Sequence, residues 1–528
     1  MRRLIRIYDT TLRDGTQGEG VSFSLEDKLR IAARLDAVGF HYIEGGWPGS
    51  NPKDLRFFRR VQDLHFKHAK IAAFSMTRRP GGSAESDPNV KALVEAGAPV
   101  ATIVGKSWDF HVTHALATTL GENLSMIGET IAHLRNHAEE VMYDAEHFFD
   151  GFRANRAYAL ETLTTAAAAG AAWLVLCDTN GGTLPADLVE ILREVRKALP
   201  TPLGIHVHND ADCAVANSIA AVAEGVDQVQ GTVNGYGERC GNANLVSVIP
   251  TLLLKMKLEC IPADGLRELR DLSRFVSELA NRTPWPAQPY VGDSAFAHKG
   301  GMHVSAVQKH PETYEHVDPA AVGNHRRVLI SELAGKANIL WKAREYGIDL
   351  AADTPDSRRI LDELKGLEDE GFQFEGAEAS FELLMERALG RGKSYFDLDA
   401  YRVLVEEQSQ AGEAVAEATV RLRVRGVPEH TAASGSGPVN ALDHALRKAL
   451  EEFYPNLKSV RLLDYKVRIL DESKGTAAKT RVLVTSGDGE ETWGTVGVSD
   501  NIIEASWRAL VDSIEYKLRR DERRSRRP

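Results

Sequence analysis

The chain of 528 residues has few cysteines, few aromatic side chains and no long apolar run. Its four cysteines are dispersed and form no CxxC pair, which argues against a disulfide framework and indicates reduced thiols. No apolar stretch approaches the roughly 18 residues that cross a bilayer, and the basic start lacks the apolar core of a signal peptide. We therefore expect a cytoplasmic globular protein with no membrane partner.

The sequence also lacks an excess of basic charge. It contains 64 Lys and Arg against 75 Asp and Glu, which gives a formal net charge of −11. General nucleic-acid binders usually carry a basic domain, so we expect no nucleic-acid partner. The basic cluster at 519–528 predicts a disordered, solvated tail. At about 100–200 residues per domain, the length predicts two to four domains.

Short β-rich runs alternate with segments of helical periodicity in the first half of the chain. The runs are 4–9, 41–46, 70–75, 99–105, 139–146, 173–179, 203–208 and 227–235. The segment 24–39 is typical of the intervening helices, with Ser24 as N-cap and Gly39 as a stop signal. Eight such units predict an α/β fold, the (β/α)8 TIM barrel. A doubly wound sheet is less favoured, because polar clusters follow almost every strand.

The chain divides into further parts after the barrel. We predict a barrel domain over 1–283, which ends at the Pro-rich PWPAQPY. A mixed linker subdomain over 284–392 combines a Gly/His-rich stretch with helices and is expected to complete the active site. Over 393–518, we predict an α+β module with an approximate internal duplication. Its predicted antiparallel strands are 417–426, 459–470, 480–489 and 492–499, and its two predicted helices are 438–453 and 501–518.

Polar residues follow the predicted barrel strands, where the active sites of TIM barrels lie. His206 and His208 are two residues apart on one strand, so their imidazoles face the same way. With Asp14 after the first strand, and with the side-chain oxygen of Asn242, they form a set that suits a divalent metal. Two nitrogen and two oxygen ligands do not select among Zn, Mn, Mg and Co. The alternative is a chance or structural HxH pair.

Arg13 and Thr179 also lie at predicted strand ends. The Arg13 guanidinium, beside the metal set, could stabilise a developing alkoxide or enolate oxygen. Its alternative is a structural salt bridge with Glu44 or Glu146. Thr179 could donate a hydrogen bond to a substrate carboxylate, or could serve only as a cap or turn residue.

A Gly/His-rich stretch beyond the barrel contains His298 and His303, and Tyr314 follows it. An imidazole on a mobile segment could cover the barrel mouth and act as an acid or a base, because its pKa lies near neutrality. The alternative is an exposed loop histidine.

Four motifs in chain order carry a resemblance that covers nearly the whole chain. They are DTTLRDGTQ (9–17), IHVHND (205–210), NGYGERCGNANL (234–245) and AFAHKGGMHVSAV (295–307). They resemble the motifs of the α-isopropylmalate/homocitrate/citramalate synthase group, whose wider superfamily also contains hydroxymethylglutaryl-CoA lyase and metal-dependent aldolases. In the C-terminal module, GSGPVNALDHAL (435–446) is similar to the regulatory domain of this group.

The resemblance implies an acyltransferase that performs a metal-dependent Claisen condensation of acetyl-CoA with a 2-oxo acid, followed by thioester hydrolysis. The residues that match the family's metal ligands are Asp14, His206, His208 and Asn242. The residues that match its catalytic groups are Arg13, Glu146, His303 and Tyr314. The base that removes the acetyl proton is not assigned among them, and in the family the segment with His303 and Tyr314 often acts across a dimer interface.

The substrate-binding residues expected from the resemblance are Arg13, Met76, Val104, Asp144 and Thr179. The segments GGWPGSNPKD and YDAEHFFDGF are most similar to the bacterial citramalate synthase branch, which implies pyruvate as the oxo acid and a role in isoleucine biosynthesis. Asp144 departs from an aromatic residue found there in some members. The alternatives are 2-isopropylmalate synthesis, in leucine biosynthesis, and a lyase or aldolase of the same superfamily.

The C-terminal module implies a homodimer whose paired modules bind an inhibitory amino acid. Isoleucine is expected for the citramalate branch and leucine for the isopropylmalate branch. The alternative is a dimerisation domain that binds no ligand.

Overall fold

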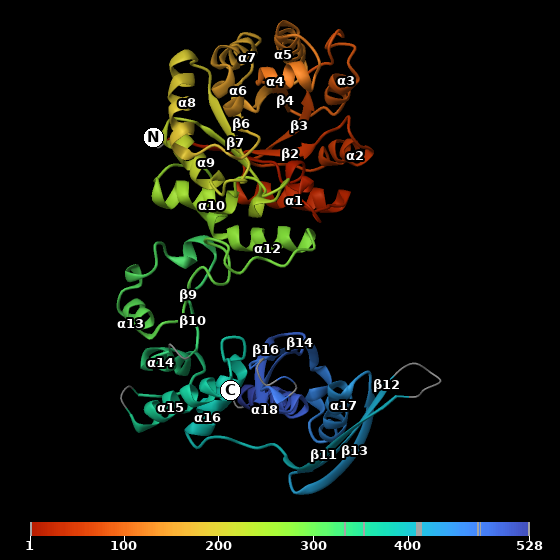
Figure 1. The fold of residues 1–528 in the computed structure, drawn as a ribbon, viewed down its shortest axis with the longest axis vertical. Coiled ribbons are helices and arrows are strands. Elements are labelled where there is room, and N and C mark those ends of the chain that lie inside the picture. The colour runs from red at the N-terminus through yellow and green to blue at the C-terminus, as the bar shows by residue number, and fades with distance from the viewer. Residues whose placement is uncertain are drawn as a thin grey trace. The chain divides into compact units, whose positions relative to one another are not determined.

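The computed structural model describes residues 3–525 except 332–333, 352–353, 408–413, 472–474 and 476. The chain forms two compact units, which Figure 1 displays as a ribbon. The first unit contains the chain up to Phe296 together with His316–Arg326, and the second contains Ala297–Glu315 and the chain from Arg327 onward. The two units are described separately.

The first unit is a closed barrel of eight strands in chain order, surrounded by helices (Figure 1). The strands are β1 (Arg6–Asp9), β2 (Tyr42–Gly46), β3 (Lys70–Met76), β4 (Val100–Lys106), β5 (Glu140–Glu146), β6 (Trp173–Asp178), β7 (Leu203–Val207) and β8 (Gln228–Gly231). Neighbouring strands are parallel, and β1 pairs with β8 through Ile7 and Val229 to close the barrel. The predicted TIM barrel is confirmed, and each β-rich run supplies one of its strands.

Six of the twelve α-helices described in the first unit, α1, α2, α3, α5, α7 and α10, begin at a residue whose side chain caps the helix. They are α1 (Leu25–Val38), α2 (Pro52–Val61), α3 (Pro88–Glu95), α4 (Asp109–His114), α5 (Leu120–Leu134), α6 (Phe148–Ala154), α7 (Arg156–Ala168), α8 (Pro185–Ala198), α9 (Ala214–Ala223), α10 (Leu245–Pro250), α11 (Ala263–Arg267) and α12 (Leu269–Leu279). Ser24 forms a capping box with Asp27, and Gly39 ends α1 with a left-handed φ of 100°. Apolar side chains between these helices and the strands form the main core.

The second unit contains helices and then two antiparallel sheets. The helices are α13 (Gly301–Lys309), α14 (Lys336–Glu345), α15 (Pro355–Asp369) and α16 (Glu378–Ala388), with the short strands β9 (Ala297–His298) and β10 (Arg327–Val328). One sheet contains β11 (Asp397–Glu407), β12 (Ala414–Val424) and β13 (Val427–Gly435), and α17 (Pro438–Leu450) follows it. The other contains β14 (Arg461–Ile469), β15 (Thr480–Gly487) and β16 (Thr492–Ser499), and α18 (Ile502–Ser525) follows it. The predicted α+β module and its internal duplication are confirmed as two βββα repeats.

The prediction of a disordered tail over 519–528 is wrong for residues 519–525, which form the last turns of α18. Acidic side chains from elsewhere in the second unit neutralise the basic cluster. The ion pairs are Arg519–Glu386, Arg520–Glu491, Arg523–Glu382 and Arg524–Glu490. The local sequence shows six arginines against only Asp521 and Glu522, because the other acidic partners come from distant segments. Residues 526–528 lie outside the described residues.

None of the four cysteines forms a disulfide in the described structure, and Cys177 and Cys260 are buried. Burial raises the pKa of the Cys260 thiol to about 12, which makes it unreactive at neutral pH. Within the described ranges, no helix is long and apolar enough to cross a membrane.

Asp488 is the acidic centre of the interactions that hold α18. Its side chain is 4% exposed, forms ion pairs with Lys517 and Arg520, and accepts hydrogen bonds from the backbone N–H groups of Glu490 and Glu491. Burial opposes ionisation of this carboxyl, but the surrounding donors and cations hold its pKa well below the usual range. The native state therefore stabilises the ionised form.

We expect Asp488→Asn to lower the free energy of unfolding of the second unit by about 3 kcal/mol at pH 7, because Lys517 and Arg520 lose their shared anion. Since the folded pKa is depressed, this stabilisation is present above the unfolded pKa of about 3.9 and is lost as pH falls towards the folded pKa. Urea unfolding at pH 7 and pH 3 should therefore show a difference that shrinks in acid. Glu490→Gln, at a 74% exposed carboxylate, is the control and should cost under about 0.5 kcal/mol. Equal losses in the two variants would contradict this assignment.

Candidate active site at the barrel mouth

A cavity of about 340 Å³ opens at the carboxyl ends of the barrel strands. Most of the residues predicted from the sequence for this site contribute to its wall. These are Arg13, Asp14, Met76, Val104, Asp144, Glu146, Thr179, His206 and His208. Parallel strands that end at one rim explain how positions spread over nearly 200 residues of sequence meet in one cavity.

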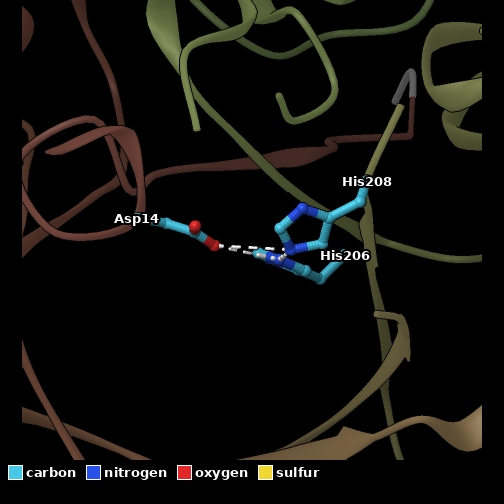
Figure 2. Close-up of side chains that lie close together, drawn as sticks. All are labelled: Asp14, His206 and His208. Carbon is cyan, nitrogen blue, oxygen red and sulfur yellow. Dashed lines mark hydrogen bonds and ion pairs between the residues drawn. The ribbon is translucent and has the colours of Figure 1, made fainter. Parts of the chain in front are cut away.

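Asp14, His206 and His208 converge from two sides of the barrel, and Figure 2 shows their side chains pointing toward one another. His206 belongs to β7, His208 follows its last residue, and Asp14 begins the short helix after β1. Asp14 Oδ2 lies 3.3 Å from His206 Nε2 and 3.8 Å from His208 Nε2, and the two Nε2 atoms are 3.4 Å apart. One donor atom from each residue lies within 4.8 Å of the others.

The donor set fits a divalent cation. Asp14 Oδ1 and Asn242 Oδ1 are buried without a hydrogen-bond partner, which for oxygen atoms normally costs about 1–3 kcal/mol each. The backbone of Asn242 pairs with His208, and its side-chain Nδ2 donates to Tyr236 O at 3.2 Å, so the amide oxygen is the unsatisfied end. A site with imidazole nitrogens, a carboxylate oxygen and an amide oxygen as ligands suits Zn, Mn, Mg or Co.

Gly237 supports the orientation of Asn242. Its φ is 153°, and a Cβ atom at this position would lie 2.1 Å from Asn242 Nδ2. Glycine is therefore required here, both for the backbone conformation and for the close approach of the amide. The loop that contains Gly237 thus supports the candidate metal site by packing against Asn242.

Charge compensation sets the protonation states in this group. Burial opposes ionisation of Asp14, but the Arg13 guanidinium and the His206 imidazole hold the pKa of this carboxyl well below its usual range. Burial and the neighbouring His206 lower the pKa of His208 to about 4. At neutral pH the group therefore contains an anionic Asp14 and a neutral His208, which are the forms that bind metals.

Arg13 is held in the cavity wall by two other side chains. Its Nε donates to Glu44 Oε2 at 2.6 Å, and its guanidinium carbon lies 4.0 Å from the centroid of the Phe74 ring. Burial disfavours the charged guanidinium, but Glu44 and Asp14 raise the pKa of Arg13 above its usual value. The salt bridge with Glu44 that the sequence suggested is present, and the same guanidinium lines the cavity. The structural and functional interpretations of Arg13 are therefore compatible.

Asp144 lies deep in the cavity wall on β5, two residues before Glu146 and on the same face. It is 3% exposed and accepts a hydrogen bond of 3.3 Å from Gln230 Nε2. Burial, with a contribution from the Glu44 charge, raises the pKa of Asp144 to about 7. The cavity therefore has a titratable acid next to the apolar side chains of Met76 and Val104.

Thr179 and Glu146 have partners at the rim. The Thr179 hydroxyl oxygen accepts a hydrogen bond of 2.8 Å from the backbone N–H of His147. Glu146 pairs with Lys106, which ends β4 and lies beside Glu146 in the strand register. Sequence reasoning missed Lys106, because the predicted strand stopped at residue 105. Its position at a strand end was the signal that could have identified it.

His303 and Tyr314 belong to the second unit, where their rings stack with centroids 4.1 Å apart. His303 lies on α13, and the Tyr314 side chain is 49% exposed. His298, from the same motif, is buried and its Nε2 lies within hydrogen-bond distance of Glu315 Oε1, at 3.0 Å. The catalytic assignment of His303 and Tyr314 stays a prediction.

Comparison with known proteins assigns all three regions. The HMGL-like family model matches residues 4–276, the homocitrate synthase post-HMGL domain-like model matches 290–371, and the LeuA allosteric (dimerisation) domain model matches 375–518. The chain is 59% identical to an (R)-citramalate synthase of Geobacter sulfurreducens, with 98% of each chain covered, and 56% identical to one of Aquifex aeolicus, with 99% of each covered. A probable 2-isopropylmalate synthase of Methanopyrus kandleri is 31% identical, with 98% of this chain and 99% of that protein covered. This chain therefore belongs to the HMGL-like family and, within it, to the (R)-citramalate synthases.

Proposed function

We propose that the chain condenses acetyl-CoA with pyruvate and hydrolyses the thioester, releasing (R)-citramalate and CoA. The observation that carries this proposal is the similarity to five (R)-citramalate synthases, at 43–59% identity over nearly the full chain. The probable 2-isopropylmalate synthase is less similar, at 31% identity. The expected place of this activity is isoleucine biosynthesis.

The proposed metal ligands are Asp14, His206, His208 and Asn242, and their unsatisfied oxygens support this assignment. A divalent cation at this position supplies Lewis acidity to the carbonyl of the oxo acid. Asp14 and His208 contribute by presenting an anionic oxygen and a neutral imidazole without a prior proton loss.

Arg13 is proposed to stabilise negative charge on the former keto oxygen. Its guanidinium is fixed by Glu44 and Phe74, so little reorganisation is needed when charge develops. Thr179 is proposed to orient the substrate carboxylate through its hydroxyl. Both residues line the same cavity as the metal-ligating group.

The proposed reaction forms one carbon–carbon bond and breaks one thioester. A base takes a proton from the acetyl methyl group, and that carbon attacks the keto carbon of pyruvate. Water then cleaves the C–S bond and releases CoA. We propose Glu146, His303 and Tyr314 as the groups that move protons. Lys106, paired with Glu146, keeps this carboxylate at the rim.

We also propose that the chain forms a homodimer and is inhibited by isoleucine bound to the C-terminal module, with leucine as the alternative inhibitor. The match of residues 375–518 to the LeuA allosteric (dimerisation) domain supports this proposal. Allostery additionally requires that the ligand bind two states of the protein with different affinity.

The substrate is tested with an oxo-acid panel. We expect kcat/KM for pyruvate to exceed that for 2-oxoisovalerate by about 10- to 200-fold or more, because an apolar pocket distinguishes a single methylene by about 1–3 kcal/mol. Release of free CoA in the presence of acetyl-CoA measures both reactions. A higher value for 2-oxoisovalerate would establish the isopropylmalate activity instead. Cleavage of citramalyl-CoA or hydroxymethylglutaryl-CoA without condensation would establish a lyase.

The metal site is tested with His208→Ala. Removing this imidazole should abolish turnover. It should also weaken divalent-metal affinity by more than the loss of a residue that only hydrogen-bonds to a ligand, which typically costs roughly 10- to 100-fold. Competition with a chromogenic chelator measures the affinity directly. His114→Ala is the matched control. His114 is exposed, and its ring contacts only Thr113 and Phe110 of the same helix by hydrogen bonds, so this variant should bind metal like the wild type. Retained affinity and activity in His208→Ala would refute the ligand assignment.

Feedback regulation is tested by adding isoleucine, leucine or valine to the full chain. Isoleucine should lower the rate of CoA release and raise the melting temperature, because a ligand that binds only the folded state stabilises it. Leucine should act more weakly and valine is the control. Sedimentation should show a dimer. A dimer that responds to none of the three amino acids would leave the module as a dimerisation domain alone.

A further inference from the structure

Gln230 is a buried polar residue inside the barrel to which sequence reasoning assigned no role. It lies on β8, is 1% exposed, and is the direct register neighbour of His206 on β7. Its Oε1 lies 3.1 Å from His206 Nδ1. Its Nε2 donates to Asp144 Oδ1 at 3.3 Å and to Gln228 Oε1 at 3.4 Å. One amide therefore contacts a proposed metal ligand and a proposed substrate-binding acid.

The surroundings of Gln230 determine which way its amide points. Two oxygen atoms, from Asp144 and Gln228, lie beside one end of the amide. The NH2 group satisfies both oxygens, whereas a flipped amide would place its oxygen against them. The Gln228 amide is itself oriented by its Nε2, which donates to Met142 Sδ at 3.5 Å. The oxygen of Gln230 therefore faces His206.

An amide oxygen beside His206 Nδ1 selects the ring tautomer. An oxygen acceptor takes the proton of Nδ1, so in the neutral imidazole, the form that binds a metal, the lone pair lies on Nε2. His206 Nε2 is the atom that faces Asp14 Oδ2, at 3.3 Å, and His208 Nε2, at 3.4 Å. Metal-ligating histidines typically donate their other ring N–H to such an acceptor, which fixes both tautomer and ring orientation.

We propose that Gln230 is a positioning residue that holds His206 in its metal-binding tautomer and, through the same amide, fixes Asp144 in the cavity wall. The inference rests on the proposed metal site. It goes beyond that site because it couples the orientation of His206, a proposed metal ligand, to Asp144, a proposed substrate-binding residue. Loss of the amide oxygen and loss of the amide N–H should therefore have separable consequences.

The closing experiment measures metal affinity without substrates, by chelator competition on the full chain, together with the visible spectrum of the Co²⁺-loaded protein. Gln230→Met should weaken affinity about 10- to 100-fold and change the Co²⁺ spectrum, because the acceptor for Nδ1–H is lost. Gln228→Met is the matched control. This residue is also a buried glutamine on the inner face of β8, and it does not contact His206. Its loss removes one acceptor for Gln230 Nε2 but leaves the other, Asp144 Oδ1, so the amide oxygen of Gln230 should still face His206. It should keep affinity within about threefold of the wild type.

Gln230→Glu separates the two contacts and provides a variant if Gln230→Met does not fold. Its carboxylate keeps an acceptor for Nδ1–H but removes the donor to Asp144. We expect metal affinity within about threefold of the wild type, or tighter, and a raised KM for pyruvate. Wild-type affinity in Gln230→Met, equal losses in Gln230→Met and Gln228→Met, or a tenfold loss in Gln230→Glu would each overturn the proposal. A wild type that binds no divalent metal would instead overturn the metal site on which it rests.

Discussion

Three carboxyl groups buried around one guanidinium are the constraint on which the barrel site depends. Asp14, Glu44 and Asp144 are at most 3% exposed, and Arg13 lies among them. Each ion removed from water costs several kcal/mol unless a partner compensates it. Arg13 forms ion pairs with Glu44 and Asp14 and helps to hold the pKa of Asp14 well below its usual range, whereas burial raises the pKa of Asp144 to about 7. Beside this arrangement, two imidazoles converge on Asp14, and a divalent cation bound there would add positive charge among the buried carboxyl groups.

Hydrogen bonds to Glu44 make this charge arrangement rigid. The Tyr8 hydroxyl donates to Glu44 Oε1 at 2.8 Å, and the Thr10 hydroxyl and Arg13 both donate to Oε2. Thr102 lies 2.8 Å from the same Tyr8 hydroxyl, so the chain of contacts crosses the barrel interior from β1 to β4. With its lone pairs engaged, Glu44 can hold Arg13 in one orientation at the cavity wall. A preorganised cation is more effective than a mobile one, because it needs no rearrangement when charge develops.

Sequence reasoning could predict the features that depend on local periodicity and on strand ends. The eight barrel strands, the pairing of His206 with His208 on one face, and the rim positions of Asp14 and Thr179 all follow from such patterns. Gln230 could not be found in this way. Its significance depends on β7–β8 register and on Asp144 across the barrel interior, neither of which has a local signal. The same reason applies to the tail, whose acidic partners are distant in sequence.

Strands β11 and β13 were not predicted, although they belong to the same repeat as predicted strands. Residues of β13 alternate between exposed and partly buried, so the strand lacks a strong apolar face. Antiparallel pairing with β12 supplies its backbone hydrogen bonds and fixes it in the sheet. The strand is therefore specified by its neighbour more than by its own residues, as is common for edge strands with weak patterning.

The chemical character of the cavity bears on which oxo acid it accepts. Met76 and Val104 offer apolar contact to a small methyl group, while Asp144 places a carboxyl next to them. Asp144 is already buried, so its hydrogen bond from Gln230 is the interaction that a ligand can disturb. A branched side chain that pressed against Asp144 and displaced it would break this hydrogen bond, and an unsatisfied buried polar group costs about 1–3 kcal/mol. An acid in place of an aromatic side chain can thus disfavour larger oxo acids through loss of a hydrogen bond, where an aromatic ring would exclude them by volume. The aspartate at position 144 is in this way compatible with the proposed specificity for pyruvate, and Gln230 contacts both this acid and His206, a proposed metal ligand.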